Sequence, residues 1–527
     1  MSKQRKGVNR RQFLKMAGAG VGLALMPPAV RPHGQQALMA LPGTGRRQSA
    51  QARSGVIRVG WEVTKKLDPA FIQTDSEISF CNAIYDYLID PTPTAELSPR
   101  LAQSWKVSDD GKQYTFNLAK GVKFHDGKAM TAEDVVWTFK RLSSKDVGSP
   151  AASLYANVTD IKAVDDTTVT FTLSTTQPDF LYNIADSHAL VLQAGTKDPN
   201  TTFIGTGPFK LDKFQPEDRA TFVANENYWI PGLPKLAGME HLYMASDAQL
   251  AALSGGQIDV VLRMPNARFV ALKDDPNLQT VNYPTSGHDV LRIRVDQKPG
   301  NDPKVIKALK MATDRAKINE VVQLGLGAVG RDAPIGPYFK EYFDPNSPLP
   351  PYDPEGAKKL LADAGYPNGL EFDLHVPNTG GRPDFATVIK DQWAKAGITV
   401  NIKLEDESTY YSDNGWLEVP LGITGWAARP TPQQYLDFSL KTGGKWNETH
   451  ISDPELDKQI DIAGTSLKME ERVAAYKEIQ RILADHGPLI IPYFFPIVGA
   501  ASKKFNFEKG FQPFAGRTDF REVTFKG

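Results

Sequence analysis

Short apolar runs that alternate with polar residues recur along the chain, separated by longer stretches with apolar residues at helical spacing. Residues 55–62 (GVIRVGWE), 167–174 (TTVTFTLS) and 398–404 (ITVNIKL) predict strands. Residues 76–89 (SEISFCNAIYDYLI) and 469–487 (MEERVAAYKEIQRILADHG) predict helices. Because strands and helices are mixed in both halves of the chain, the pattern predicts an α/β fold with two lobes.

Turn and cap residues mark the boundaries of further elements. Residues 104–128 predict a hairpin that turns at 109–111 (DDG), and residues 209–229 predict a second one that turns at 216–218. Thr131, with Asp134 three residues later, predicts the start of a helix.

Proline and glycine delimit the helices of the second half. Asp302-Pro303 and Asp353-Pro354 each predict an N-cap followed by proline at the first helical position. Gly365 and Gly397 predict the ends of two helices, and residues 488–495 (PLIIPYFF) predict a buried strand.

Residues 253–257 read LSGGQ, the signature of the ATP-hydrolysing subunit of ABC transporters. That chemistry also needs a phosphate-binding loop of the form G-x-x-x-x-G-K-[ST], which the chain lacks. Ser246 and Gln249 have the spacing of a capping box, so we interpret the segment as a helix that ends at Gly255-Gly256.

The charge of the chain is unevenly distributed. Of 527 residues, 41% are apolar and 23% are charged, as in soluble proteins with two or three domains. Residues 1–52 hold nine Lys or Arg and no acid, which leaves 52 basic against 61 acidic residues and a net charge of −9 in the remainder. This charge argues against nucleic acid or an anionic membrane as a partner.

The N-terminal segment resembles a twin-arginine export signal. Arg10-Arg11 precede Phe-Leu-Lys and a Gly-rich apolar run too short to span a bilayer. Cleavage after Ala52 fits an A-x-A site, Ala40 is the alternative, and an uncleaved basic tail is the competing interpretation. We expect residues 1–52 to be removed, which leaves a soluble periplasmic protein.

Motifs for catalysis or cofactor binding are weak. Cys81 is the only cysteine, which excludes an internal disulfide, and its apolar surroundings predict a core residue. The eight histidines lack the spacing of a metal site. Residues 325–330 (GLGAVG) match G-x-G-x-x-G, but they follow a predicted helix, so we interpret them as a loop. We therefore expect no catalytic residues, no metal site and no cofactor.

Four blocks in order resemble bacterial extracellular solute-binding proteins of family 5. This family comprises the dipeptide-, oligopeptide-, nickel- and opine-binding components of ABC importers. The resemblance covers essentially the whole chain after the signal. It also implies that the chain is the partner of an ATPase and not an ATPase itself. The blocks are 97–142, 205–229, 302–330 and 352–369.

The resemblance implies a two-lobed periplasmic binding protein fold (type II, cluster C-like) that closes on its ligand at a hinge. Lobe I would comprise residues 53–285, with an extra subdomain at about 90–205. Lobe II would comprise residues 286–498, and residues 499–527 would return to lobe I. The implied partners are an ABC permease and ATPase complex in the inner membrane, and we expect a monomer.

Residues 422–438 (GITGWAARPTPQQYLDF) depart from the family's peptide binders, which typically carry an acidic residue shortly after Gly-Trp. Here Gly425-Trp426 is followed by Ala-Ala and then Arg429. A guanidinium suits a carboxylate or phosphate, so we predict an anionic ligand group on Arg429, with Trp426 against its apolar or sugar face. The competing interpretation pairs Arg429 with a surface acid and places Trp426 in the core.

The Trp-x-x-Arg-Pro form resembles the branch of the family that includes opine and sugar-phosphate binders, while peptides stay possible through backbone contacts. Trp61, Tyr283 and Tyr435 are further candidates, because aromatic residues near strand ends and a hinge suit a cleft wall. The alternatives to a solute-binding protein for an ABC importer are an enzyme exported by the twin-arginine route and a binder of chelated nickel.

Overall fold

The structure, a computed structural model, describes residues 53–92, 96–412, 415–507, 511–512 and 515–527. The predicted signal, residues 1–52, lies outside the described residues. The described residues all belong to one unit, residues 47–527. None of the helices in these ranges is long and apolar enough to cross a membrane.

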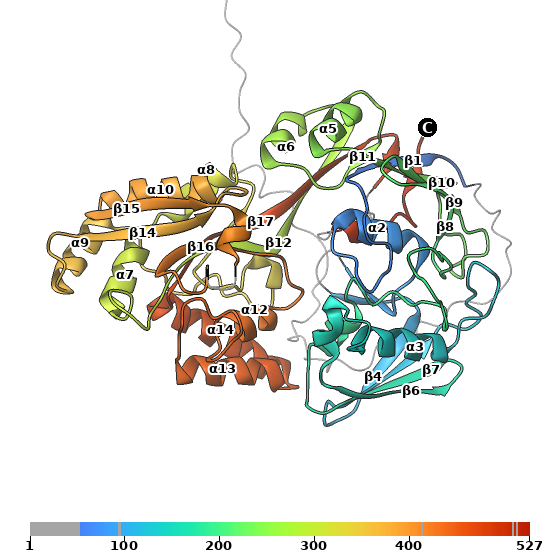
Figure 1. The fold of residues 1–527 in the computed structure, drawn as a ribbon, viewed down its shortest axis with the longest axis horizontal. Coiled ribbons are helices and arrows are strands. Elements are labelled where there is room, and N and C mark those ends of the chain that lie inside the picture. Colours follow the sequence, from blue (N-terminus) through green and yellow to red (C-terminus); the bar gives the residue numbers. More distant parts are fainter. Residues whose placement is uncertain (1–52, 93–95, 413–414, 508–510, 513–514) are drawn as a thin grey trace, which may run out of the picture. The chain divides into compact units, whose positions relative to one another are not determined.

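A mixed sheet of eleven strands forms the backbone of the fold (Figure 1). Its strand order is β15-β14-β16-β12-β17-β11-β1-β10-β9-β8, and β13 pairs with β17 outside this path. In chain order the strands are β1 (Val56–Trp61), β8 (Phe209–Gln215), β9 (Arg219–Ala224), β10 (Gly238–Tyr243), β11 (Val260–Val261), β12 (Leu278–Ile293), β13 (Ala328–Val329), β14 (Leu370–Pro377), β15 (Ile398–Glu405), β16 (Leu421–Trp426) and β17 (Leu489–Ser502).

Smaller sheets complete the strand inventory of the described residues. A four-stranded antiparallel sheet has the order β4-β5-β7-β6, and two pairs of strands stand apart from it. The members of the four-stranded sheet are β4 (Ala102–Val107), β5 (Gln113–Leu118), β6 (Val158–Asp165) and β7 (Thr168–Leu173); the pairs are β2 (Ile89–Pro91) with β3 (Leu97–Pro99), and β18 (Phe505–Asn506) with β19 (Thr524–Phe525).

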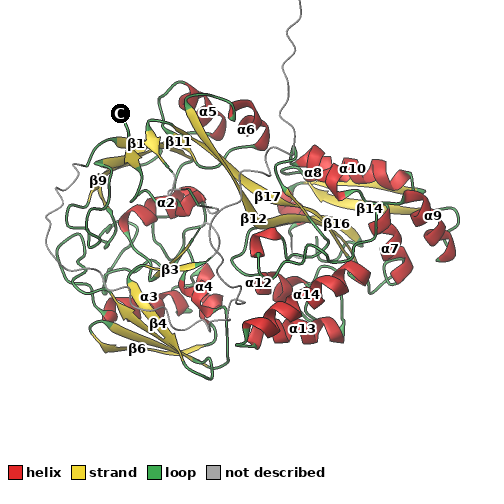
Figure 2. Cartoon of the chain, turned by 180° about the vertical axis from the view of Figure 1, so that it is seen from behind, coloured by secondary structure: helices red, strands yellow, loops and turns green. Residues whose placement is uncertain are grey.

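Helices pack on these sheets, with α10 against β14 and β15 and α3 against β6 and β7. Figure 2 separates the helices from the strands by colour. The helices are α2 (Asp75–Ile84), α3 (Ala132–Ser143), α4 (Phe180–Ile184), α5 (Ser246–Ser254), α6 (Asn266–Leu272), α7 (Pro303–Met311), α8 (Arg315–Val322), α9 (Pro354–Asp363), α10 (Arg382–Ala394), α11 (Glu407–Tyr410), α12 (Pro432–Ser439), α13 (Pro454–Thr465) and α14 (Met469–His486), with 3-10 turns η1 (Pro150–Tyr155), η2 (Pro337–Phe339) and η3 (Ala515–Arg517).

The buried apolar side chains form two groups of clusters. One group draws on residues 57–278 and 498–523, and we call this part the first lobe. The other group draws on residues 290–494, and we call this part the second lobe. The exact boundaries predicted near 285 and 498, and the subdomain at about 90–205, stay predictions.

Strands β12 and β17 run side by side from one lobe into the other (Figure 1). β12 pairs with β17 from Leu278 to Arg292, and from His288 onward it also pairs with β16 of the second lobe. The β12–β17 register shifts between Pro284 and His288. Such an irregularity bends a strand locally, so this stretch is where the two lobes are joined through an interrupted ladder.

Many predicted caps and turns are confirmed. Asp134 accepts a hydrogen bond from the Thr131 backbone N–H at 2.8 Å at the start of α3. The side chain of Asp302 caps α7 by accepting from the Lys304 N–H at 2.8 Å. Gly111, at the turn between β4 and β5, has φ of 67°, which favours glycine.

Three local predictions are wrong in detail. The predicted helix 76–89 ends at Ile84, because Tyr85 is extended and the chain then continues into β2. The LSGGQ helix has Ala245 as its N-cap instead of Ser246, whose hydroxyl donates to Glu62 Oε1 at 2.8 Å. The glycine-rich loop at 325–330 contains the short strand β13, which pairs with β17.

Candidate ligand-binding site

The Gly-Trp pair lies at the end of β16, beside the strand that links the lobes. Gly425 is opposite Asp289 of β12, and Trp426 is opposite His288. The guanidinium of Arg382 lies directly against Gly425, where a Cβ atom would overlap its Nη2. A side chain at this position would therefore push the Arg382 guanidinium away from its bond with Asp289.

Trp426 belongs to the interior of the second lobe. Its side chain is 6% exposed, and its ring meets Tyr435 and Trp446 edge-on at centroid distances of 5.9 and 5.8 Å. Its Nε1 donates to Glu448 Oε1 at 3.1 Å. The indole thus packs as a core residue does, and a ligand would reach only its small exposed edge.

The backbone of Arg429 is fixed to β12. Its N–H donates to Ser286 Oγ at 2.8 Å, and the Ser286 hydroxyl donates to the Arg429 carbonyl at 2.7 Å. Ser286 is fully buried, so this pair of hydrogen bonds ties the loop after β16 to the interlobe strand. Ser286 was not predicted from the sequence, since a lone serine before a glycine gives no signal of its own.

The side chain of Arg429 has no partner among the residues that the structure describes. Within the described ranges its guanidinium forms no ion pair and no hydrogen bond, and its Nε is buried without an acceptor. A buried donor without an acceptor is costly and uncommon in folded proteins. Among the described residues, therefore, no acid pairs with Arg429, whereas Trp426 lies in the core as the competing interpretation expected.

Tyr435 holds the same loop through hydrogen bonds of its hydroxyl group. It is 1% exposed, and its hydroxyl donates toward the carbonyls of Ser286 and Ala427 at 2.9 and 2.8 Å. Burial raises the pKa of Tyr435, so the hydroxyl stays protonated and able to donate. In this structure Tyr435 positions the segment that carries Arg429.

Trp61 lies in the first lobe, away from this group. It ends β1 directly opposite Tyr243 of β10, and its side chain is 6% exposed. Trp61 Nε1 is buried without a hydrogen-bond partner among the described residues. Tyr283, the remaining candidate, is half-buried on β12 opposite Ile497 and packs against the first lobe's core.

A second arginine, which no sequence motif singles out, begins a helix beside the site. Arg382, the first residue of α10, donates from Nε to Asp289 Oδ1 at 2.8 Å. Tyr493 Oη donates to the other oxygen of Asp289 at 2.6 Å. Burial raises the pKa of the Asp289 carboxyl, against the opposing effects of Arg382 and Tyr493. Arg382 is thus a second cation next to Gly425.

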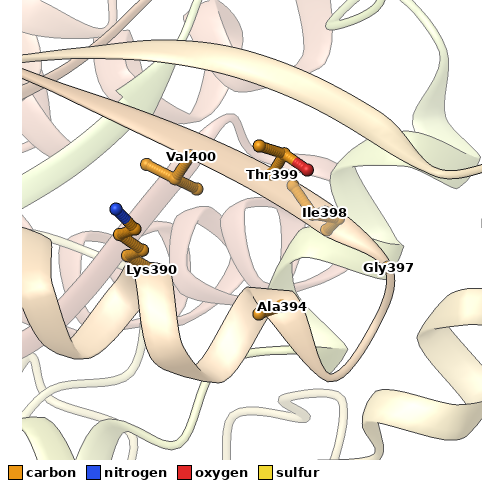
Figure 3. A pocket seen from close by; sticks show the side chains of 6 residues that line it. All are labelled: Lys390, Ala394, Gly397, Ile398, Thr399 and Val400. Carbon is orange, nitrogen blue, oxygen red and sulfur yellow. The ribbon is translucent and has the colours of Figure 1, made fainter.

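A surface cavity of about 240 Å³ lies elsewhere, between α10 and β15 (Figure 3). β15 is the edge strand of the sheet, and β14 separates it from β16. The cavity therefore lies apart from the segment that carries Arg429. Its lining residues are Lys390, Ala394, Gly397, Ile398, Thr399 and Val400. Among the residues that the structure describes, no group of His, Cys, Asp or Glu side chains could hold a metal ion.

The family model for bacterial extracellular solute-binding proteins, family 5, matches residues 96–447, which is more than half of the chain. The chain belongs to family 5 of the bacterial extracellular solute-binding proteins. This confirms the family predicted from the four sequence blocks. Members of family 5 are substrate-binding proteins of ABC importers.

Two relatives of this family 5 protein match most of its length. Heme-binding protein A of Haemophilus influenzae is 30% identical over 449 residues, which cover 77% of this chain and 81% of that protein. Di/tripeptide-binding protein 1 of Pseudomonas aeruginosa is 30% identical over 465 residues, which cover 81% and 85%.

Solved structures agree with the fold. The binding protein AgaA in complex with agropinic acid, from A. tumefaciens R10, has a TM-score of 0.71 and 23% identity, and the match covers 90% of this chain and 99% of AgaA. At this identity the likeness shows the fold alone. The predicted two-lobed α/β binding-protein fold is confirmed.

Proposed function

We propose that this family 5 protein captures a small solute with an anionic group and holds that group on Arg429. The observation that carries the proposal is the Arg429 guanidinium, which has no partner in the described part of the chain and stands on a loop tied to the interlobe strand through Ser286. A guanidinium binds a carboxylate or phosphate through two parallel hydrogen bonds, which would satisfy the donors left unpaired.

The position of Arg429 supports a role in capture. The Arg429 segment is bonded to β12 at the interrupted part of its ladder with β17, where the two lobes are joined. A ligand that contacts both lobes favours the arrangement in which it contacts both best. Trp61 of the first lobe remains our candidate for the opposite wall, and Trp426 and Tyr435 would act mainly by holding Arg429 in place.

Peptides, opines and sugar phosphates are the candidate ligand classes. The relatives are named for binding heme and di- or tripeptides, and AgaA is titled as a complex with agropinic acid. Each of those ligands carries a carboxylate, the group that an arginine fork fits. The protein would act in the periplasm after export by the twin-arginine route. It would release its ligand unaltered to an ABC permease and ATPase complex, and it would work as a monomer and not as an enzyme.

Thermal unfolding of the wild type and of Arg429→Ala, each with a panel of peptides, opines and sugar phosphates, tests the assignment. A ligand at a hundredfold excess over its dissociation constant stabilises the wild type by about 2.7 kcal/mol. We expect Arg429→Ala to lose most of this stabilisation for anionic ligands, because the charged partner of the ligand is gone.

Two further variants make the result specific. Arg429→Lys keeps the charge without the planar fork, so it should retain only part of the response. Arg481→Ala removes an exposed arginine of the second lobe that pairs with Glu478, and it should respond like the wild type. An unchanged response of Arg429→Ala to every anionic ligand would show that the anion binds elsewhere.

A further inference from the structure

An ion pair joins the two lobes outside the strands that connect them. Asp179 lies at the start of α4 in the first lobe, and Arg472 lies in the first turns of α14 in the second lobe. Arg472 Nη2 is 2.5 Å from Asp179 Oδ1, and the two side chains are 6% and 13% exposed. Of the ion pairs formed by the described residues, this is the one whose partners come from different lobes.

The second lobe holds Arg472 in one orientation. Its Nε donates to the Ala463 carbonyl at 2.8 Å, and its guanidinium lies over the rings of Tyr342 and Tyr476 at 5.6 and 5.9 Å. Burial acts to lower the pKa of Arg472, but the charge of Asp179, the neighbouring tyrosines and the hydrogen bond to Asp179 together outweigh it, and the pKa is raised. The cation is therefore preorganised for one carboxylate, and that carboxylate belongs to the other lobe.

The first lobe holds Asp179 as firmly. Its neighbour Phe180 is buried and packs against Tyr114 of β5, at a ring distance of 4.9 Å. Tyr114 Oη in turn donates to the Gln177 carbonyl at 2.9 Å. Asp179 is thus fixed to the core of the four-stranded sheet, so it cannot follow Arg472 if the lobes move apart.

A second contact lies beside the ion pair. A Cβ atom at Gly111, in the turn between β4 and β5, would come within 2.8 Å of both Leu467 and Thr176. Leu467 belongs to the loop that precedes α14, so the turn of the first lobe lies against the second lobe here as well. Figure 2 shows α4 and α14 below the β12–β17 strands that link the lobes.

We propose that Asp179 and Arg472 form an interlobe clasp, which holds the hinge in the arrangement seen in this structure. Any rotation about β12 and β17 that separates α4 from α14 breaks this pair and leaves the largely buried Arg472 without its counter-charge, and a buried unpaired charge is unfavourable. The clasp therefore sets how much of the ligand-free population has this arrangement. That fraction scales the apparent affinity of any ligand that binds it selectively. The proposal concerns hinge movement and does not depend on Arg429.

Spin-label distance measurement on the ligand-free protein tests the clasp. Labels at Lys162→Cys in β6 and Lys458→Cys in α13 report the distance between the lobes; both lysines are exposed, and the native Cys81 is fully buried. We expect a narrow distribution for the labelled wild type. Asp179→Asn, which keeps the shape of the side chain, should increase the population outside that peak about tenfold.

Controls separate the clasp from general loosening of the fold. Arg472→Gln should give the same distribution as Asp179→Asn, because either change removes the same pair. Glu471→Gln, which removes an exposed charge next to Arg472, should match the wild type. Arg429→Ala should also leave the ligand-free distances unchanged, so failure of the ligand proposal and failure of the clasp give different results.

The exchange Asp179→Arg with Arg472→Asp should restore much of the narrow peak. Near-ultraviolet circular dichroism on each variant checks that the cores are intact. If Asp179→Asn and Arg472→Gln both fold and their distance distributions superimpose on that of the wild type, the pair does not restrain the lobes.

Discussion

Glu448 places a carboxylate inside the second lobe, where three side chains donate hydrogen bonds to it. The residue is 1% exposed, and its carboxylate accepts hydrogen bonds from Trp426 Nε1 at 3.1 Å, Arg292 Nε at 3.0 Å and Thr424 Oγ1 at 2.5 Å. Arg292 is itself fully buried. Because these partners surround the end of β16, Glu448 fixes the direction in which the chain leaves Trp426 toward Arg429.

Glu448→Gln tests this arrangement by keeping the shape and removing the charge. The substitution leaves Arg292 buried without its counter-charge, which typically costs about 3–5 kcal/mol. Urea unfolding of the purified variant would measure the loss. Glu455→Gln, an exposed acid at the start of α13, should change the free energy of unfolding by less than about 1 kcal/mol. A loss no larger for Glu448→Gln than for this control would contradict the structural role.

At the scale of elements, the close approach of α10 to β16 decides what can stand at Gly425. Arg382 begins α10, extends over Gly425 and bonds Asp289 on the neighbouring strand β12. Three elements therefore meet over one residue without a side chain. The same junction carries the segment with Arg429, so its geometry bears on ligand binding as well as on stability.

Gly425→Ala should disturb this junction. The added methyl group overlaps the Arg382 guanidinium, and relief of such overpacking typically costs about 1–3 kcal/mol. Chemical denaturation would measure the cost, and the response to anionic ligands should weaken in parallel. The matched change Gly255→Ala, at the end of α5, meets its nearest neighbour at 3.2 Å and should cost less. Equal stability of the two variants would argue against the contact.

Local sequence signals located most elements but not all of their ends. Asp302-Pro303 and the turn at Gly111 were predicted correctly because each rests on a bond or a backbone angle that the residue itself supplies. Helix α2 stops five residues earlier than predicted, although its apolar pattern continues to Ile89. There the packing of an extended segment, which periodicity does not encode, overrides the helical pattern.

At the scale of the whole molecule, each lobe buries a neutral histidine. His241 in β10 is fully buried, and burial lowers its pKa to about 3. Burial lowers the pKa of His288 in β12 to about 4, although a backbone hydrogen bond at Ser286 opposes this shift. In the unfolded chain both would titrate near 6.5. The unfolded state therefore binds more protons than the native state below that pH.

Stability should accordingly fall as the pH drops from about 6.5 toward 4, by about 1.4 kcal/mol per pH unit for each histidine. Urea unfolding between pH 7 and 4.5 would measure the slope. Phenylalanine in His241→Phe takes up no proton. The slope of the free energy of unfolding against pH should therefore decrease by about 1.4 kcal/mol per pH unit. If its pH dependence matches that of the wild type, His241 does not stay neutral in the folded protein or is not buried in it.

The large sheet could not have been derived from local patterns. β12 contains Pro284 and Gly287, which argue against a strand when read in isolation, yet it pairs with β17 and β16 across both lobes. Arg382 and Ser286 were missed for a related reason. Each acquires its role from a residue far away in the chain, Asp289 in the first case and Arg429 in the second.

The sequence by itself determined the family, the two-lobed α/β class and the replacement of an acid by arginine at position 429, since these depend on motifs and on local caps and turns. The tertiary structure alone decided that Arg429 has no acidic partner among the described residues, that Trp426 is held inside by Glu448, and that Asp179 meets Arg472. The physical reason is that charge pairing and burial depend on which distant segments pack together, and residue order along the chain does not state this.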